Sequence, residues 1–163
     1  PLALDALLEA ETLRVLNGIS NHDNVGAAFR NAAAFGAGGV LLDEQSCDPL
    51  YRKSIRVSAG AALWLPFVRD GQGEDHIGRL QNAGFDVWAM TPRATAAELH
   101  QLKPSAKTAI LLGSEGPGLE DALIHRCRPV RIAMASGFDS INVATAGAIA
   151  LAHCHACSVT GSA

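Results

Sequence analysis

The stretch NHDNVGAAFRNAAAFGAGGVLL, residues 21–42, contains a loop, a helix and a strand in succession. Five apolar residues recur at the spacing of one helix face: Val25, Ala28, Phe29, Ala32 and Phe35. This spacing predicts a helix near 24–35. Asn24 is expected to be its N-cap, because its side chain can accept a hydrogen bond from a free amide, and Gly36 a C-terminal cap. The run GVLLD, 39–43, then predicts a buried strand.

The same alternation continues along the chain. Apolar runs predict strands near 14–19, 39–43, 63–68, 86–91, 108–113 and 130–134. Helical patterns lie near 24–35, 50–58, 74–83, 118–125 and 140–157, and LALDALLEAETL, 2–13, is a candidate for a further amphipathic helix. Strands alternating with helices predict an α/β fold, with a mainly parallel sheet covered by helices on both faces.

Composition indicates a compact globular protein. The chain has 163 residues, 48% hydrophobic and 18% charged, and we expect residues 1–163 to form a single domain. No apolar run of about 18 residues suggests a membrane span, and nothing resembles a signal peptide. The cysteines, Cys47, Cys127, Cys154 and Cys157, are few and unevenly spaced, which favours a reduced, cytoplasmic location.

Charge argues against a domain that binds nucleic acid by bulk electrostatics, since the formal net charge is −3. A local basic patch, YRKSIR at 51–56, can contact RNA phosphates or form a solvated helix face, and the sequence does not choose between them. His22 has the same two interpretations: contact with RNA or catalysis, or a solvated loop histidine.

Ligands of parallel sheets bind beyond the carboxyl ends of the strands, so the loops after strands matter most. The first such loop precedes the helix near 24–35, which carries Arg30 off its apolar face. Arg30 either solubilises the helix surface or contacts a phosphate or carboxylate near Asn21 and Asn24.

The second loop is LLGSEGPGLED, 111–121. Its glycines at 113, 116 and 118 allow close approach of the backbone to a ligand and positive φ angles. The spacing is neither the dinucleotide fingerprint nor the nucleophile elbow. A plain strand-to-helix turn is the alternative, but such a turn has no need of a carboxylate like Glu115.

The third loop lies within VRIAMASGFDSINVATAGAIALAHC, 130–154. Ser140 is expected to be the N-cap of the following helix. Capping by Ser140 leaves Asn142 unexplained, because asparagine is a mediocre helix former. The later segment HCHAC, 153–157, suggests a metal or redox site, but it lies at the end of a predicted helix and no second ligand pair accompanies it.

Together and in this order, the three loops resemble the motifs of the SpoU/TrmH-type RNA ribose 2′-O-methyltransferases of the SPOUT class. The matching segments are NHDNVGAAFRNAAAFGAGGV, LLGSEGPGL and IAMASGFDSINVATAGAIAL, and the resemblance covers residues 14–155. It implies a deep trefoil knot in the C-terminal part of the sheet, S-adenosylmethionine as cofactor without a metal, a homodimer, and rRNA or tRNA as substrate. Many relatives carry a preceding RNA-binding domain, which we expect to be absent from this chain.

The resemblance also assigns residues. Those that match cofactor-binding positions are Thr91, Leu112, Gly113, Ser114, Ile132, Met134 and Ile141. Those that match functional polar positions are Arg30, Asn24, Glu115, Ser140 and Asn142. Asn31 and Asp139 depart from the residues common in the family, which bears on substrate preference rather than on the chemistry.

The implied reaction is attack of a ribose 2′-oxygen on the sulfonium methyl, with alignment of the two as a main source of rate. The family assigns Arg30 to activation of the hydroxyl, but a guanidinium is a poor base near neutral pH. We expect it to bind a phosphate and stabilise the developing alkoxide. Two rival functions are possible. A nucleotide-dependent Rossmann protein would have a glycine fingerprint after the first strand, which this sequence lacks. The other is a catalytically silent homologue that binds RNA or cofactor.

Overall fold

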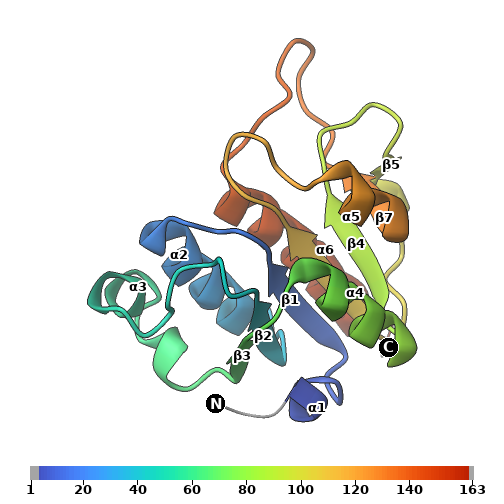
Figure 1. Ribbon diagram of the computed structural model, residues 1–163. Coiled ribbons are helices and arrows are strands. Elements are labelled where there is room, and N and C mark those ends of the chain that lie inside the picture. The colour runs from blue at the N-terminus through green and yellow to red at the C-terminus, as the bar shows by residue number, and fades with distance from the viewer. Residues whose placement is uncertain (1–3, 162–163) are drawn as a thin grey trace.

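The computed structural model describes residues 4–161, which form one parallel sheet with helices on both faces (Figure 1). The strands are β1 (Thr12–Leu16), β2 (Gly39–Leu42), β3 (Phe67–Arg69), β4 (Asp86–Met90), β5 (Ala97–Glu98), β6 (Thr108–Leu112) and β7 (Arg128–Arg131). Their order across the sheet is β3-β2-β1-β6-β4-β7-β5, and each adjacent pair is parallel. The α/β class predicted from the sequence is confirmed.

The helices are α1 (Leu4–Leu7), α2 (His22–Ala34), α3 (Arg52–Val57), α4 (Gly73–Asn82), α5 (Asp121–Arg126) and α6 (Val143–Thr160), with short 3-10 turns η1 (Ala61–Leu63) and η2 (Leu99–Gln101). Alternate residues of each strand enter two different cores. In β6, Ile110 packs with α2 and α6 on one face, whereas Leu111 packs with α1, α4 and α5 on the other. Burial on both faces explains why the central strands are mainly apolar.

Several predicted boundaries were wrong for identifiable reasons. The run 63–68 yields only the short strand β3, because its first residues form η1 and leave Leu63 and Trp64 exposed. The helix expected at 118–125 begins at Asp121, since Gly118 has a φ of 72° that helical backbone does not adopt. The expected amphipathic helix in 2–13 is one turn, and its first residues lie outside the described part of the chain. The strand β5 was not predicted.

Two predicted helix caps were also wrong. The N-cap of α2 is Asn21, whose Oδ1 accepts from the Asp23 amide at 2.8 Å, and not Asn24. The N-cap of α6 is Asn142, not Ser140, since the Asn142 side chain accepts from the amides of Ala144 and Thr145. Capping thus accounts for an asparagine that helix propensity alone could not explain.

Helix α6 is the one helix in the described range that is long and apolar enough to cross a membrane, with a mean hydropathy of 1.3. Core helices of globular proteins satisfy the same criterion, so this is weak evidence for a span. Ala144, Gly147, Ala150, Leu151 and Cys154 of α6 are buried. The inner face of α6 therefore belongs to the core beside α2 and β6.

An unpaired arginine lies beneath α6. Arg14 of β1 is fully buried, and burial lowers the pKa of its guanidinium to about 9. Its Nη2 lies 3.5 Å from the carbonyl oxygen of Ala144, while Nε and Nη1 have no partner among the described residues. The guanidinium packs directly on Gly147, since a Cβ there would lie 2.1 Å from Nη2 and would displace it. An unpaired buried cation costs stability.

We therefore expect Arg14→Met to retain or raise the free energy of unfolding at pH 7, by up to about 4 kcal/mol. The stability of the wild type should rise relative to that of the variant as pH increases through about 9, because folded Arg14 loses its proton there. The unfolded chain keeps that proton to a much higher pH, because the pKa of an exposed guanidinium is not lowered by burial. Urea denaturation at pH 7 and pH 10 measures both effects, and a large loss at pH 7 would contradict this account.

Candidate active site

A cavity of about 370 Å³ lies at the carboxyl ends of β4, β6 and β7. The residues that directly follow these strands, Thr91, Gly113 and Ile132, contribute to its wall. The remaining lining residues are Met90, Pro92, Leu112, Ser114, Glu115, Gly116, Gly118, Met134, Asp139, Ser140, Ile141, Asn142, Val143 and Ala146. Its size lies within the range of about 300–1,000 Å³ that is usual for ligand pockets.

All seven residues matched to cofactor-binding positions line this cavity. Aliphatic side chains form one part of the wall, with Leu112, Ile132 and Ile141 among them, and the glycine loop after β6 supplies backbone groups. Such a wall suits a flat, largely apolar ring with polar edges. The cavity residues therefore fit an adenosyl group, although four lining residues, Met90, Pro92, Val143 and Ala146, were not predicted.

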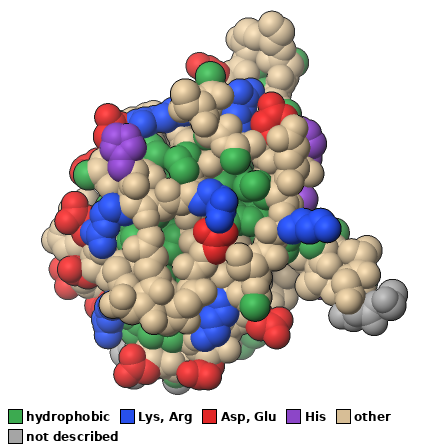
Figure 2. Space-filling model, turned by 90° about the vertical axis from the view of Figure 1, so that its right-hand side faces the viewer, with side chains coloured by type: hydrophobic (Ala, Val, Ile, Leu, Met, Phe, Trp, Pro, Cys, Tyr) green, Lys and Arg blue, Asp and Glu red, His purple; other side chains and the backbone are tan. Residues whose placement is uncertain are grey.

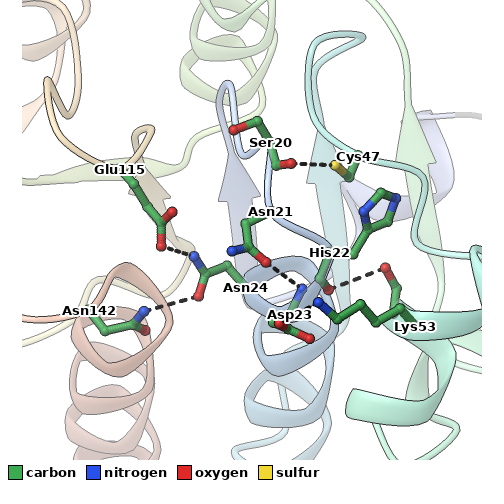
Figure 3. Close-up of polar contacts among 10 residues, drawn as sticks. Ser20, Asn21, His22, Asp23, Asn24, Cys47, Lys53, Glu115 and Asn142 are labelled. Carbon is green, nitrogen blue, oxygen red and sulfur yellow. Dashed lines mark hydrogen bonds and ion pairs between the residues drawn. The ribbon is translucent and has the colours of Figure 1, made fainter.

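Asn24 connects the three motif loops at the rim of the cavity (Figure 3). Its side chain is nearly buried, and its Nδ2 donates a short hydrogen bond to Oε1 of Glu115 in the loop after β6. Its Oδ1 accepts from Nδ2 of Asn142 at 3.0 Å. One amide thus joins α2, the glycine loop and the start of α6, and it brings together three of the five residues predicted to be functional.

The glycine loop depends on its own backbone contacts. The Gly118 amide donates to the Ser114 carbonyl at 3.1 Å, and the Ser114 hydroxyl donates to the Gly118 carbonyl at 3.3 Å. A Cβ on Gly113 would lie 2.4 Å from the Leu119 amide nitrogen. Gly113 is thus required for closure of the loop itself, whereas Gly116 and Gly118 supply the positive φ angles.

The other two predicted polar residues do not join the Asn24 network. Ser140 is exposed and lines the cavity. Arg30 is exposed, lies outside the cavity lining, and forms no ion pair among the described residues. Six positions separate it from Asn24 on α2, so the two side chains leave the helix axis about 120° apart. Arg30 is thus free to contact a molecule that extends beyond the cavity.

Sequence reasoning missed the residue that holds the loop before α2. Asp43 is buried at the end of β2, and its carboxylate accepts from the Gly18 amide at 3.0 Å and from the Ser46 hydroxyl at 2.6 Å. The Ser46 hydroxyl in turn accepts from the Ile19 amide at 3.0 Å. An aspartate directly after an apolar strand was the available signal. Asn31, noted in the sequence only as a departure from the family pattern, joins α2 to α6 by donating to the Ala144 carbonyl at 3.1 Å.

The segment 153–157 places Cys157 Sγ 3.9 Å from Nε2 of His153, and two of its side chains have structural explanations. Burial raises the pKa of the Cys154 thiol to about 12, which disfavours the reactive thiolate. His153 Nε2 lies 2.7 Å from the Leu102 carbonyl oxygen and so has a structural partner. Among residues 4–161, no group of three or more His, Cys, Asp or Glu side chains could hold a metal ion.

Comparison with known proteins identifies the family. The sequence model of the SpoU rRNA Methylase family matches residues 12–152, which include all three motif loops and the whole sheet. The chain belongs to the SpoU rRNA methylase family. The sequence resemblance to the SpoU/TrmH-type enzymes is thereby confirmed.

Two relatives illustrate the similarity. An uncharacterized tRNA/rRNA methyltransferase of Mycobacterium tuberculosis is 39% identical over 154 residues, which are 92% of this chain and 54% of that protein. The 23S rRNA (guanosine-2′-O-)-methyltransferase RlmB of Vibrio cholerae is 32% identical over 145 residues, 88% of this chain and 58% of that one. The chain thus spans little more than half the length of these SpoU relatives.

Solved SpoU structures share the fold. An AdoMet-bound rRNA methyltransferase from Sinorhizobium meliloti superposes with a TM-score of 0.83 at 29% identity, over 90% of this chain and 56% of that one. The SpoU methyltransferase AviRb from Streptomyces viridochromogenes superposes with a TM-score of 0.85 at 27% identity, over 98% of this chain and 65% of that one.

Proposed function

We propose that this chain is the methyl-transfer domain of an S-adenosylmethionine-dependent RNA methyltransferase, acting on a ribose 2′-hydroxyl of rRNA or tRNA. The observation that carries the proposal is the coincidence of two features at one edge of the sheet. A cavity lined by all seven residues matched to cofactor contacts adjoins the hydrogen-bonded side chains of Asn24, Glu115 and Asn142. Membership of the SpoU family supports it.

In this proposal the walls of the cavity hold the adenosyl group. Leu112, Ile132 and Ile141 contact its apolar faces, while backbone groups near Gly113 and Met134 read its polar edges. The bound cofactor supplies an electrophilic methyl group. The cavity and rim residues would contribute by holding the cofactor and the ribose in fixed positions, so that alignment is a main source of rate.

The polar residues at the rim act on the RNA. The Asn24 network sets the position of the Glu115 carboxylate, and Ser140 also lines the cavity. Arg30, exposed and without an ion pair in the described chain, binds the adjacent phosphate and stabilises negative charge developing on the ribose oxygen. A guanidinium is a poor base near neutral pH, so the proton of the ribose hydroxyl passes to solvent.

We further propose the trefoil knot, a homodimer and a cytoplasmic location. Segment 132–146 and the loops after β4 and β6 line a single cavity, as is expected of a C-terminal segment tucked through a loop. Helix α6 exposes Ile149 and Val159 and has few charged residues, which suits an interface between two copies. The bacterial rRNA and tRNA methyltransferases among the relatives favour the location.

The proposed function predicts binding of S-adenosylmethionine and methyl transfer to RNA. Titration calorimetry should detect the cofactor equally with and without a chelator, because no group of three or more His, Cys, Asp or Glu side chains in the described part of the chain could hold a metal ion. Incubation with labelled cofactor and rRNA or tRNA should yield 2′-O-methyl nucleotides. Cofactor binding without transfer to any RNA would favour the catalytically silent homologue, and the absence of binding would refute the proposal.

A second prediction concerns Arg30. We expect Arg30→Ala to fold and to bind S-adenosylmethionine normally, because this side chain lies outside the cavity. Methyl transfer should fall about a hundredfold or more through loss of a few kcal/mol of transition-state stabilisation. Arg30→Lys should recover only part of the rate, since lysine keeps the charge but lacks the planar fork. Full activity of the alanine variant would assign Arg30 to surface solubility alone.

A further inference from the structure

A basic and aromatic surface adjoins the candidate active site on α3 and the turn before it. We call the α3 surface the set His22, Tyr51, Arg52, Lys53 and Arg56. Helix α3 has the sequence RKSIRV and contains no acidic residue, and its three basic residues are exposed. The SpoU family assignment and the cavity do not account for this surface.

The α3 surface is held firmly against α2. A Cβ on Gly26 would lie 2.7 Å from the Ser54 carbonyl oxygen, so the two helix backbones are in close contact. The Ser54 hydroxyl also donates to the His22 carbonyl at 3.3 Å, and Lys53 pairs with Asp23 at 2.8 Å (Figure 3). Asn24 follows on the same helix, which places the α3 surface beside the rim of the cavity.

Of the basic residues in the α3 surface, Lys53 pairs with Asp23, whereas the two arginines have no carboxylate partner among the described residues. Arg30, Arg52 and Arg56 form no ion pair in the part of the chain that the structure describes. At the opposite edge of the sheet, near β5, arginines have acidic partners: Arg93 pairs with Asp121, and Arg128 with Asp86. Figure 2 shows that face, with basic and acidic side chains next to one another. A chain of net charge −3 thus keeps unpaired guanidinium groups beside its candidate active site.

Tyr51 adds an exposed aromatic ring to this surface. The ring contacts the His22 ring at a tilt of 43°, with 4.4 Å between ring centroids, and 55% of the residue is exposed. An exposed aromatic ring held by a neighbouring ring can serve as a stacking surface for an unpaired base. Paired bases offer no such face, and recognition of unpaired RNA commonly uses aromatic stacking.

We propose that the α3 surface binds single-stranded RNA next to the nucleotide that is methylated. Tyr51 stacks on an unpaired base, and Arg52 and Arg56 contact the phosphates on either side of it. This inference rests on the proposed function and adds a substrate class to it: the methylated ribose lies in a loop or other unpaired segment of the RNA.

Fluorescence anisotropy with a labelled single-stranded RNA of mixed sequence, and with its duplex, tests the inference. The double variant Arg52→Gln/Arg56→Gln should lower the slope of log affinity against log salt by about 1.4, at about 0.7 for each phosphate contact. Tyr51→Ala should weaken single-strand binding about 5- to 150-fold, and Tyr51→Phe should not.

The matched control is Arg79→Gln/Arg126→Gln, which removes two exposed arginines from α4 and α5. It should leave both the salt slope and the affinity near those of the wild type. Failure of the wild type to bind single-stranded RNA at low salt, or equal effects of the two double variants, would overturn the inference.

Cofactor binding and methyl transfer, measured on the same variants, separate this inference from the proposed function. Suppose that the wild type methylates RNA, and that the Tyr51 and arginine variants bind and methylate RNA as well as the wild type. The α3 surface is then not the RNA-binding site, whereas the proposed function is retained. If the wild type binds single-stranded RNA through the α3 surface but transfers no methyl group, the surface stands and the proposed reaction is wrong.

Discussion

The side-chain amide of Asn24 is the contact on which the candidate site depends. It donates to Glu115 and accepts from Asn142, so three loops that are far apart in the sequence meet at one nearly buried group. A buried side-chain amide without hydrogen-bond partners would lower the free energy of unfolding by about 1–3 kcal/mol. The two other loops supply those partners to Asn24, so their alignment at this edge stabilises the protein. The parallel sheet brings the loops to the same edge, and Asn24 sets their relative position there.

Much of the fold could be predicted from the sequence because the central strands are buried on both faces. Runs such as 39–42 and 109–112 are apolar throughout, and their burial leaves few alternatives to a parallel sheet between helices. The apolar face of α2 was also predicted correctly, since Val25, Ala28 and Phe29 are buried as expected. The cavity residues were reached through the resemblance to a known family, since aliphatic residues at strand ends would otherwise indicate only core packing.

Other features could not be predicted because they depend on contacts between distant segments. Asn24 was expected to cap α2 because it precedes an apolar stripe, but the sequence does not reveal that Glu115 lies within reach of its amide. Asn142 looked unsuited to a helix and is the cap of α6. Arg14 was not singled out at all, although it is the one fully buried arginine in the described chain. Helix propensity describes how well a residue suits its local position, but its hydrogen-bond partners are known only from the tertiary structure.

The central claim is that the hydrogen bonds of Asn24 position the three loops of the site. It is tested most directly by exchanging the donor and the acceptor of the hydrogen bond between Asn24 and Glu115. Asn24→Asp places a second carboxylate against Glu115, whereas adding Glu115→Gln restores a donor and an acceptor. The measurement is the free energy of unfolding, with the affinity for S-adenosylmethionine alongside, for both single variants and the double variant. The account predicts that Asn24→Asp lowers the free energy of unfolding by about 1–3 kcal/mol and that the double variant recovers at least about 0.5 kcal/mol of it together with cofactor affinity. Strictly additive effects of the two substitutions would contradict it.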